Sequence, residues 1–264
     1  METSKYIVEY YSNYNEDGRL ASRHGSVEFL TTMRYIQRYL KPGDRILEIG
    51  AGAGRYSHAL ARQGFRVDAV ELVEHNIGVF QRNTEPDEQI TITQGNAMDL
   101  SGFADDTYNI TLLLGPMYHL YLESDKKTAL AEAIRVTKRG GVLFVAYCIS
   151  DATLMSDFFA SQKLDLLDYI EKGLIDPETF ATHSEPQDLF ELVRKEDVFT
   201  LMSGFPVTRL HYVATDGYTH HMRESLKDMD DVLFEQYLKY HFAICEREDM
   251  AGLSHHSLDV FRKD

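Results

Sequence analysis

The sequence predicts an α/β protein built on a doubly wound, mostly parallel sheet of seven strands. Between residues 44 and 148, five short apolar runs alternate with helical patterns, which is typical of parallel strands joined by crossover helices. The first run ends in glycines at alternate positions, Gly50, Gly52 and Gly54, where nucleotide-binding folds place a strand-to-helix turn. Two later strand patterns, at 207–214 and 257–262, bring the expected number of strands to seven.

Apolar spacing and turn residues give the order of the elements. Apolar residues recur at helical spacing from Val27 to Leu40, and Gly64 marks the end of the next helix. The expected strands are 44–49, 66–72, 90–94, 109–114, 142–148, 207–214 and 257–262. The expected helices are 26–40, 55–63, 74–82, 125–137, 153–169, 186–195 and 229–247.

The chain divides into four parts on this pattern. Residues 1–25 are rich in tyrosine and are expected to form an N-terminal lid, and 26–150 form the Rossmann-like core. Residues 151–205 are longer than one crossover helix needs, which favours a helical cap over the active site. Residues 206–264 hold the last strands and a helical insertion, 216–252, for which extension of the cap and a homodimer interface are both considered.

Composition and charge limit the classes of molecule that the chain is expected to bind. With 42 acidic residues against 27 basic ones, the formal net charge of −15 disfavours nucleic acid and anionic membranes. There is no apolar run near 20 residues and no charged-then-apolar leader, so we expect a cytoplasmic protein that does not enter a membrane. Cys148 and Cys245 form no spaced metal or disulfide pattern. These features favour a small-molecule substrate.

The glycine turn predicts a nucleotide-like ligand, and Glu48 indicates which one. A dinucleotide fingerprint needs a third glycine where this chain has Arg55, and a carboxylate beside a pyrophosphate would be repulsive. The carboxylate of Glu48, two places before Gly50, can instead meet the ammonium group of S-adenosylmethionine, directly or through water. The charge pattern therefore favours the sulfonium cofactor.

Two later segments fit the rest of such a cofactor. Glu71 ends the second strand, 21 residues after Gly50, where a carboxylate can accept both hydroxyls of a ribose. Asn96, Ala97, Met98 and Asp99 follow the third strand and would face the adenine, although Asp99 by itself could equally be a helix cap.

The fourth strand runs into Leu114-Gly115-Pro116-Met117-Tyr118-His119. Ligands of open parallel sheets bind beyond the carboxyl ends of the strands, so Tyr118 and His119 are expected beside the reacting methyl group. His119 is the candidate general base because the ordinary histidine pKa, ~6.5, suits proton removal near neutral pH. The alternative is a histidine that only bonds to the backbone of its loop.

Other residues are candidates for the lid or for the substrate. The rings of Tyr10, Tyr11 and Tyr14 could close over the sulfonium, although packing of an N-terminal helix is a competing role. Arg19 could bind an acidic group. His183 and the pairs at 220–221 and 255–256 match no zinc spacing, so no metal is expected, and His183 is kept as a substrate candidate.

Taken together, these motifs resemble the class I S-adenosylmethionine-dependent methyltransferases, and among them the bacterial small-molecule branch. The resemblance covers residues 26–148 and also rests on Arg135-Val-Thr-Lys-Arg-Gly-Gly141 before the fifth strand. It implies transfer of a methyl group to O, N or S, less often C, with S-adenosylhomocysteine as product. Its implied cofactor residues are Glu48, Gly50, Ala51, Gly52, Gly54, Tyr56, Glu71, Leu72, Asn96, Ala97, Met98, Asp99, Leu114 and Gly115.

Two alternatives remain open at this point. A methyltransferase of RNA or protein would need a basic groove beside residues 115–119. An NAD-dependent oxidoreductase or a non-catalytic nucleotide binder could use the same glycine turn.

Overall fold

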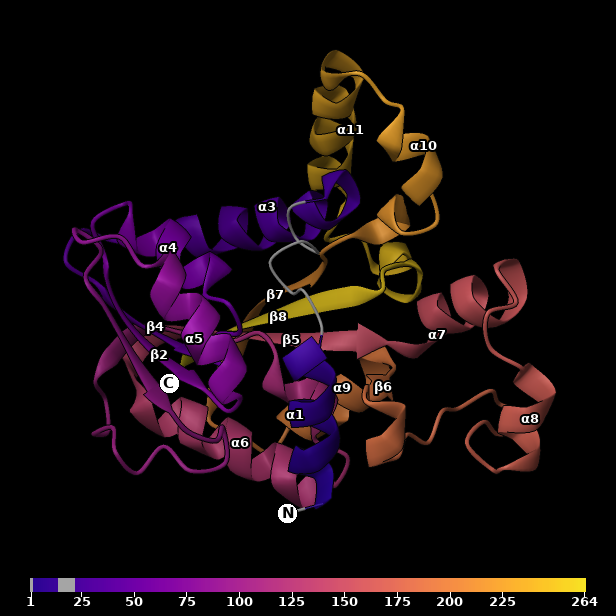
Figure 1. Cartoon of the computed structure of the whole chain (residues 1–264), viewed down its shortest axis with the longest axis horizontal. Helices are drawn as coiled ribbons and strands as arrows, with labels where there is room; N and C mark the ends of the chain where they lie inside the picture. The colour runs from indigo at the N-terminus through magenta and orange to yellow at the C-terminus, as the bar shows by residue number, and fades with distance from the viewer. Residues whose placement is uncertain (1, 14–21) are drawn as a thin grey trace.

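The computed structural model describes residues 2–13 and 22–264, which form a central sheet with helices on both of its faces (Figure 1). Seven strands lie in the order β3-β2-β1-β4-β5-β8-β7, and the two-residue β6 pairs with the end of β5. This confirms the predicted α/β fold and its seven-stranded sheet. The strands are β1 (Arg45–Ile49), β2 (Arg66–Glu71), β3 (Ile90–Gln94), β4 (Tyr108–Leu113), β5 (Thr137–Ile149), β6 (Leu192–Val193), β7 (Val207–Ala214) and β8 (His256–Lys263).

The direction of each strand decides what meets at the edge of the sheet. The first five strands are parallel, and β8 runs antiparallel between β5 and β7. The carboxyl ends of β1, β4, β5 and β7 therefore lie at the same edge as the amino end of β8. The register Cys148↔His256 across β5 and β8 places His256 at that edge, which is where open parallel sheets bind ligands.

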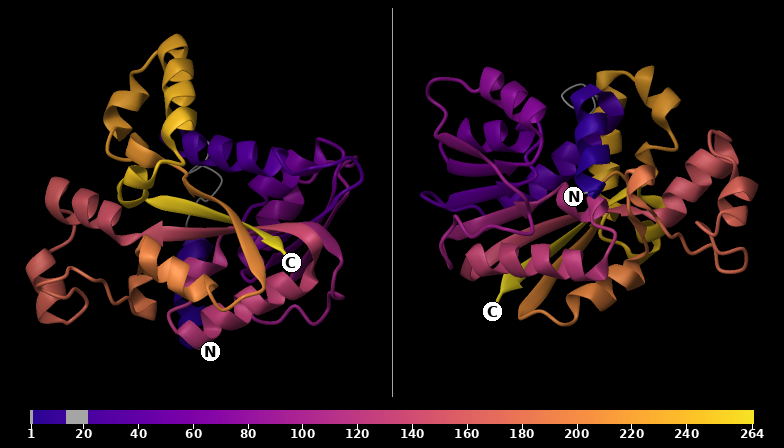
Figure 2. Two further views of the ribbon diagram at one scale, coloured as in Figure 1. Left: turned by 180° about the vertical axis from the view of Figure 1, so that it is seen from behind. Right: turned by 60° about the horizontal axis from the view of Figure 1, so that its bottom comes forward.

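Helices of two groups cover the sheet, and Figure 2 shows the layers from two further sides. Side chains of α3 and α4 pack on one face, and those of α6 and α9 pack on the other. The helices are α1 (Glu2–Asn13), α3 (Arg23–Gln37), α4 (Arg55–Ala61), α5 (Glu74–Asn83), α6 (Glu123–Val136), α7 (Ser150–Thr153), α8 (Leu166–Glu171), α9 (Lys195–Met202), α10 (Arg223–Lys227) and α11 (Asp231–Ile244). The 3₁₀-helices are η1 (Pro116–His119), η3 (Pro186–Asp188), η4 (Gly217–Thr219) and η5 (Glu248–Leu253), and η2 (Leu154–Ala160) is a π-helix.

The central strands are buried on both faces. Ile46 and Leu47 are neighbours that point to opposite sides of β1, and both are fully buried. A strand of this kind reads as an unbroken apolar run, which is why β1 could be identified from its sequence.

The predicted helix over 186–195 is wrong. This stretch forms the turn η3 and the strand β6, and the helix comes later, as α9. Leu189 has a left-handed backbone, with φ of 69°, and this conformation ends the helical path. The side chain of Asp197 accepts a hydrogen bond from the backbone N–H of Arg194 (2.8 Å) and so fixes the start of α9.

The predicted helix over 153–169 is also interrupted. It consists of α7 and η2, then a break, and then α8, whose first turn is capped by Asp165. Residues 150–182, here called the arm, project from the carboxyl end of β5 (Figure 1). The arm has its own small apolar cluster, centred on Leu154, Phe158 and Ile175.

On the other side of the sheet edge, α10 and α11 rise next to α3 (Figure 1). No helix among the residues that the structure describes is long and apolar enough to cross a membrane.

Candidate active site

A cavity of about 600 Å³ lies along the carboxyl edge of the sheet. Its wall is formed by the glycine turn, the end of β2, the 95–98 loop, the η1 turn, α1, α3 and the start of β8. This volume is within the range of sites for small molecules. The predicted cofactor residues that line it are Glu48, Gly50, Ala51, Gly52, Tyr56, Glu71, Leu72, Asn96, Ala97, Met98, Leu114 and Gly115.

The glycine turn brings the first and fourth strands into contact. Gly50 has φ of +75°, and a Cβ built on it would lie 2.7 Å from Cδ of Pro116. Any side chain at this position would push apart the turns that follow β1 and β4. Gly54 is also required, but for packing: its Cβ would lie 2.5 Å from the ring of Phe80. Gly54 is not among the residues that line the cavity, and its contact with a cofactor stays a prediction.

Glu48 lies at the floor of the cavity and is almost completely buried, with 2% of its surface exposed. Burial raises the pKa of Glu48 to about 8, although the hydroxyl of Ser57 donates a hydrogen bond to its carboxylate and opposes this effect. A cationic group that enters the cavity would supply the missing counter-charge. This is the environment expected for a carboxylate that meets an ammonium group.

Glu71 is held in place by three N–H donors. Its Oε2 accepts a hydrogen bond from the backbone of Gly52 (2.8 Å), and its Oε1 accepts from the backbone of Val73 (2.9 Å) and from the amide of Asn76 (3.3 Å). Glu71 therefore ties the end of β2 to the glycine turn. Each carboxylate oxygen has two lone pairs, so Oε1 is fully used and Oε2 retains one acceptor position, which suits one hydroxyl of a ribose.

The structure moves Asp99 out of the predicted site. Asp99 is exposed, its Oδ1 accepts a hydrogen bond from the backbone of Ser101 (3.1 Å), and it does not line the cavity. No helix begins at Asp99 in the described part of the chain, and its hydrogen bond to Ser101 closes a local turn. Asn96, Ala97 and Met98 keep their predicted place at the wall.

Tyr118 and His119 line the cavity from the η1 turn, which follows β4. Nδ1–H of His119 donates to the carbonyl of Leu189 (2.8 Å), so Nε2 is the acceptor for the hydroxyl of Tyr11 (3.0 Å). Burial lowers the pKa of His119 to about 4, which keeps its ring neutral. The hydroxyl of Tyr118 donates to the carbonyl of Leu114 (2.9 Å).

The predicted lid is present in part. Ile7 and Tyr11 of α1 line the cavity, whereas Tyr10 points elsewhere and packs edge-on against Phe190, with ring centroids 6.1 Å apart. Tyr14 and Arg19 fall outside the described residues. His183 is exposed and does not line the cavity, so the structure does not support a substrate contact for it.

Segment 151–205 contributes only Pro186 to the described wall. The arm extends away from the sheet edge, so it forms less of a cap over the site than its length suggested (Figure 1).

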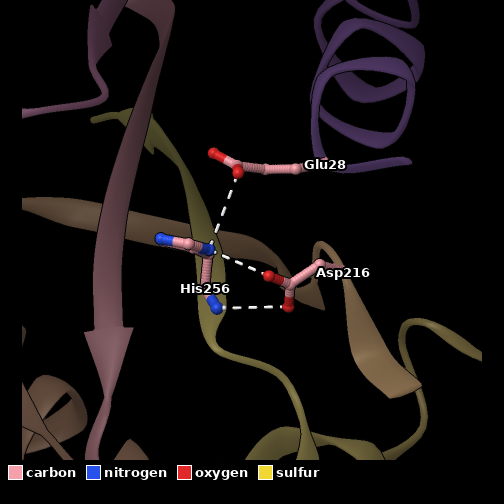
Figure 3. Close-up of side chains that lie close together, drawn as sticks. All are labelled: Glu28, Asp216 and His256. Atoms are coloured by element: carbon pink, nitrogen blue, oxygen red, sulfur yellow. Dashed lines mark hydrogen bonds and ion pairs between the residues drawn. The ribbon is translucent and has the colours of Figure 1, made fainter. Parts of the chain in front are cut away.

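Sequence reasoning missed several residues of the wall. Arg55, at the first position of α4, lies over the ring of Phe29 at 4.5 Å, and its buried Nε has no hydrogen-bond partner among the described residues. Glu28 and His256 also line the cavity, and Asp216 lies beside His256 (Figure 3). No local spacing could have indicated this group, because its members are far apart in the sequence. Glu28 lies on α3, Asp216 is the second residue after β7, and His256 begins β8.

His256 is held between two carboxylates. Its Nδ1 donates to Oδ2 of Asp216 (2.9 Å) and lies 3.6 Å from Oε2 of Glu28. Burial by itself lowers the pKa of His256, but the nearby carboxylates outweigh burial and raise the pKa well above its ordinary value.

Comparisons with known proteins agree with this geometry. Residues 47–145 match the family described as methyltransferase domain. The demethylmenaquinone methyltransferase of Renibacterium salmoninarum is 35% identical over 106 residues, which are 40% of this chain and 41% of that protein. The chain thus matches less than half the length of such curated relatives.

Solved structures share the fold over almost the whole chain. The magnesium protoporphyrin IX methyltransferase from Synechocystis, with bound S-adenosylhomocysteine, has a TM-score of 0.59 at 11% identity, covering 99% of this chain and 100% of that one. The N-methyltransferase NodS from Bradyrhizobium japonicum, also with S-adenosylhomocysteine, has a TM-score of 0.58 at 13% identity, covering 99% and 98%. The family match thus identifies residues 47–145 as a methyltransferase domain, and the strand order is that of a fold shared with methyltransferases solved with S-adenosylhomocysteine.

Proposed function

We propose that the protein is an enzyme that transfers the methyl group of S-adenosylmethionine to an O, N or S atom, less often a C atom, of a small molecule. One observation carries this proposal: a single cavity is lined by Glu48 and Glu71 on β1 and β2, which we take as the cofactor end, and by His119 after β4 and His256 on β8, further along the sheet, which we take as the acceptor end. Methyl donor and acceptor would share one water-poor space, in which alignment alone contributes on the order of 7–11 kcal/mol to the lowering of the barrier.

Three features support a small acceptor over RNA or protein. Side chains of α1 contribute to the wall of the cavity, which favours a ligand that fits inside it. The net charge of −15 opposes binding of a polyanion. The demethylmenaquinone and magnesium protoporphyrin IX methyltransferases are named for small-molecule acceptors.

At the acceptor end, Tyr118 and His119 remain our candidates for catalysis. The bonds of His119 to Leu189 and Tyr11 favour a role in which it holds the lid helix over the acceptor. To act as the predicted general base, its Nε2 would first have to release Tyr11. We propose that Tyr11 leaves this bond when the acceptor enters.

The test supplies the protein with S-adenosylmethionine and separate panels of phenols, amines and thiols, and it measures S-adenosylhomocysteine by mass spectrometry. We expect turnover with at least one panel, and none with Glu71→Ala. S-adenosylhomocysteine at 100 times its Kd should also stabilise the protein by about 2.7 kcal/mol, whereas NAD should not. Methylation of bulk RNA or protein without turnover of any small molecule would refute the proposal, and stabilisation by NAD alone would do so as well.

A further inference from the structure

Three side chains that are suited to bind a metal ion converge at the acceptor end of the cavity: Glu28 of α3, Asp216 after β7, and His256 at the start of β8 (Figure 3). One ligand atom from each lies within 4.8 Å of the other two. Glu28 and His256 line the cavity, and their side chains are 15% and 24% exposed, while that of Asp216 is 8% exposed. The group therefore faces the cavity on one side and the protein interior on the other.

We propose that Glu28, Asp216 and His256 form a binding site for a divalent first-row transition cation such as Mn²⁺ or Zn²⁺. Ligands that subtend right to tetrahedral angles at an ion, with bonds of about 2.1 Å, lie about 3.0–3.4 Å apart. The observed separations from Nδ1 of His256, 2.9 Å to Asp216 and 3.6 Å to Glu28, are close to this range. Small side-chain movements would place one ion between all three atoms.

Charge and donor type indicate the class of ion. Binding of the ion at Nδ1 of His256 would release the proton that this nitrogen shares with Asp216, and the two carboxylates and the neutral imidazole would then carry a charge of −2, which a divalent cation balances. The imidazole nitrogen favours Mn²⁺, Fe²⁺ or Zn²⁺ over Mg²⁺ and Ca²⁺, which prefer oxygen ligands alone.

The ligands are held by contacts outside the group. Oδ1 of Asp216 accepts hydrogen bonds from the hydroxyl of Ser254 (2.5 Å) and from the backbone N–H of His256 (3.2 Å). These bonds direct the other oxygen, Oδ2, toward Nδ1 of His256. Outer bonds of this kind orient metal ligands in known sites.

A simpler role for the pair of Asp216 and His256 is to fix the start of β8. Glu28 can take part in that role as well, because its Oε2 lies at ion-pair distance from Nδ1 of His256, at 3.6 Å. Titration with metal ions therefore distinguishes an ion site from a structural ion-pair cluster, and Glu28 is the residue to change because it is the ligand from a distant helix.

An ion at this position would have its open coordination sites toward the cavity. It could hold an acceptor through an oxygen atom and lower the pKa of its hydroxyl group. This consequence rests on the proposed methyl transfer, but binding of the ion does not.

The test uses full-length protein stripped with EDTA and then dialysed. Mn²⁺ is titrated and followed by its electron paramagnetic resonance signal, and Zn²⁺ is titrated by calorimetry. We expect one ion per chain for the wild type and at least tenfold weaker binding for Glu28→Gln and for His256→Gln. Asp125→Asn, which removes a different carboxylate of the same cavity wall, should bind the ions like the wild type.

If Glu28→Gln binds S-adenosylhomocysteine within about twofold of the wild-type affinity, the variant is folded. If Glu28→Gln does not fold, ion binding by His256→Gln decides the test. The inference is overturned if the wild type binds neither ion with a Kd below about 1 mM, which corresponds to a binding free energy of ~4 kcal/mol. It is equally overturned if the folded variants bind ions as tightly as the wild type. A protein that binds one ion but transfers no methyl group would refute the proposed function and leave the ion site intact.

Discussion

Glu48→Gln should make the cofactor-free protein more stable at neutral pH and at the same time weaken its hold on the cofactor. Glu48 is 2% exposed, and burial raises its pKa from 4.5 to about 8. At pH 7 the folded protein therefore retains a proton that the unfolded chain releases. Retaining this proton has a free-energy cost, which glutamine avoids because it does not ionise.

The size of this cost follows from the pKa. Between pH 4.5 and pH 7 there are 2.5 pH units, and each is worth about 1.4 kcal/mol, which gives on the order of 3 kcal/mol. Because the pKa is higher in the folded state, the contribution of Glu48 to stability is fully present below pH 4.5 and is lost as the pH rises toward 8. Glu48→Gln should thus resemble the wild type near pH 4.5 and exceed its stability by about 3 kcal/mol at pH 7 and by about 4 kcal/mol at pH 8.

Urea unfolding of the cofactor-free proteins at pH 4.5, 7 and 8 measures this difference, with Glu171→Gln, at an exposed position of α8, as the matched control. Calorimetry with S-adenosylhomocysteine should show about ten- to a hundredfold weaker binding by Glu48→Gln, because a charged hydrogen-bond partner is lost. The reasoning fails if the stability gap is the same at pH 4.5 and pH 8, or if the variant binds the ligand as tightly as the wild type.

Three further predictions concern the same cavity. Glu71→Ala removes the acceptor of three N–H groups and should weaken S-adenosylhomocysteine binding by about two orders of magnitude in calorimetry; near-normal affinity would contradict this. His119→Ala should keep that affinity within a few-fold and lose turnover on whichever acceptor is found, and equal turnover would remove His119 from the catalytic candidates. Gly50→Ala places a Cβ 2.7 Å from Pro116 at φ of +75°, so it should cost about 1–2 kcal/mol and lower the Tm by several degrees, with weaker ligand binding; an unchanged Tm would refute the proposed contact.

The cofactor end was predictable because its signals are local. Strands buried on both faces read as apolar runs, and the glycines, Glu48 and Glu71 lie at fixed distances from the ends of those strands. The place of Asp99 outside the cavity wall was not predictable, because turns and ligand contacts use the same residue types, and only the path of the chain separates them.

The acceptor end was less predictable because it is assembled from distant segments. Glu28 and His256 are 228 residues apart in the sequence, and only the antiparallel return of β8 along β5 brings them together. The sequence analysis compared His256 and other histidines with zinc-binding spacings. Such spacings detect only ligands that are close together in the sequence. Helix α9 was shifted because a left-handed Leu189 is invisible to apolar periodicity.

The separate apolar cluster of the arm has a consequence for how this protein can diverge. Leu154, Phe158 and Ile175 bury their side chains mainly against other residues of 150–182, so the arm and the glycine turn share few contacts. Substitutions in the two regions should then have additive effects on the free energy of unfolding. The arm could then change in sequence or length during evolution without a change in how the glycine turn binds its ligand.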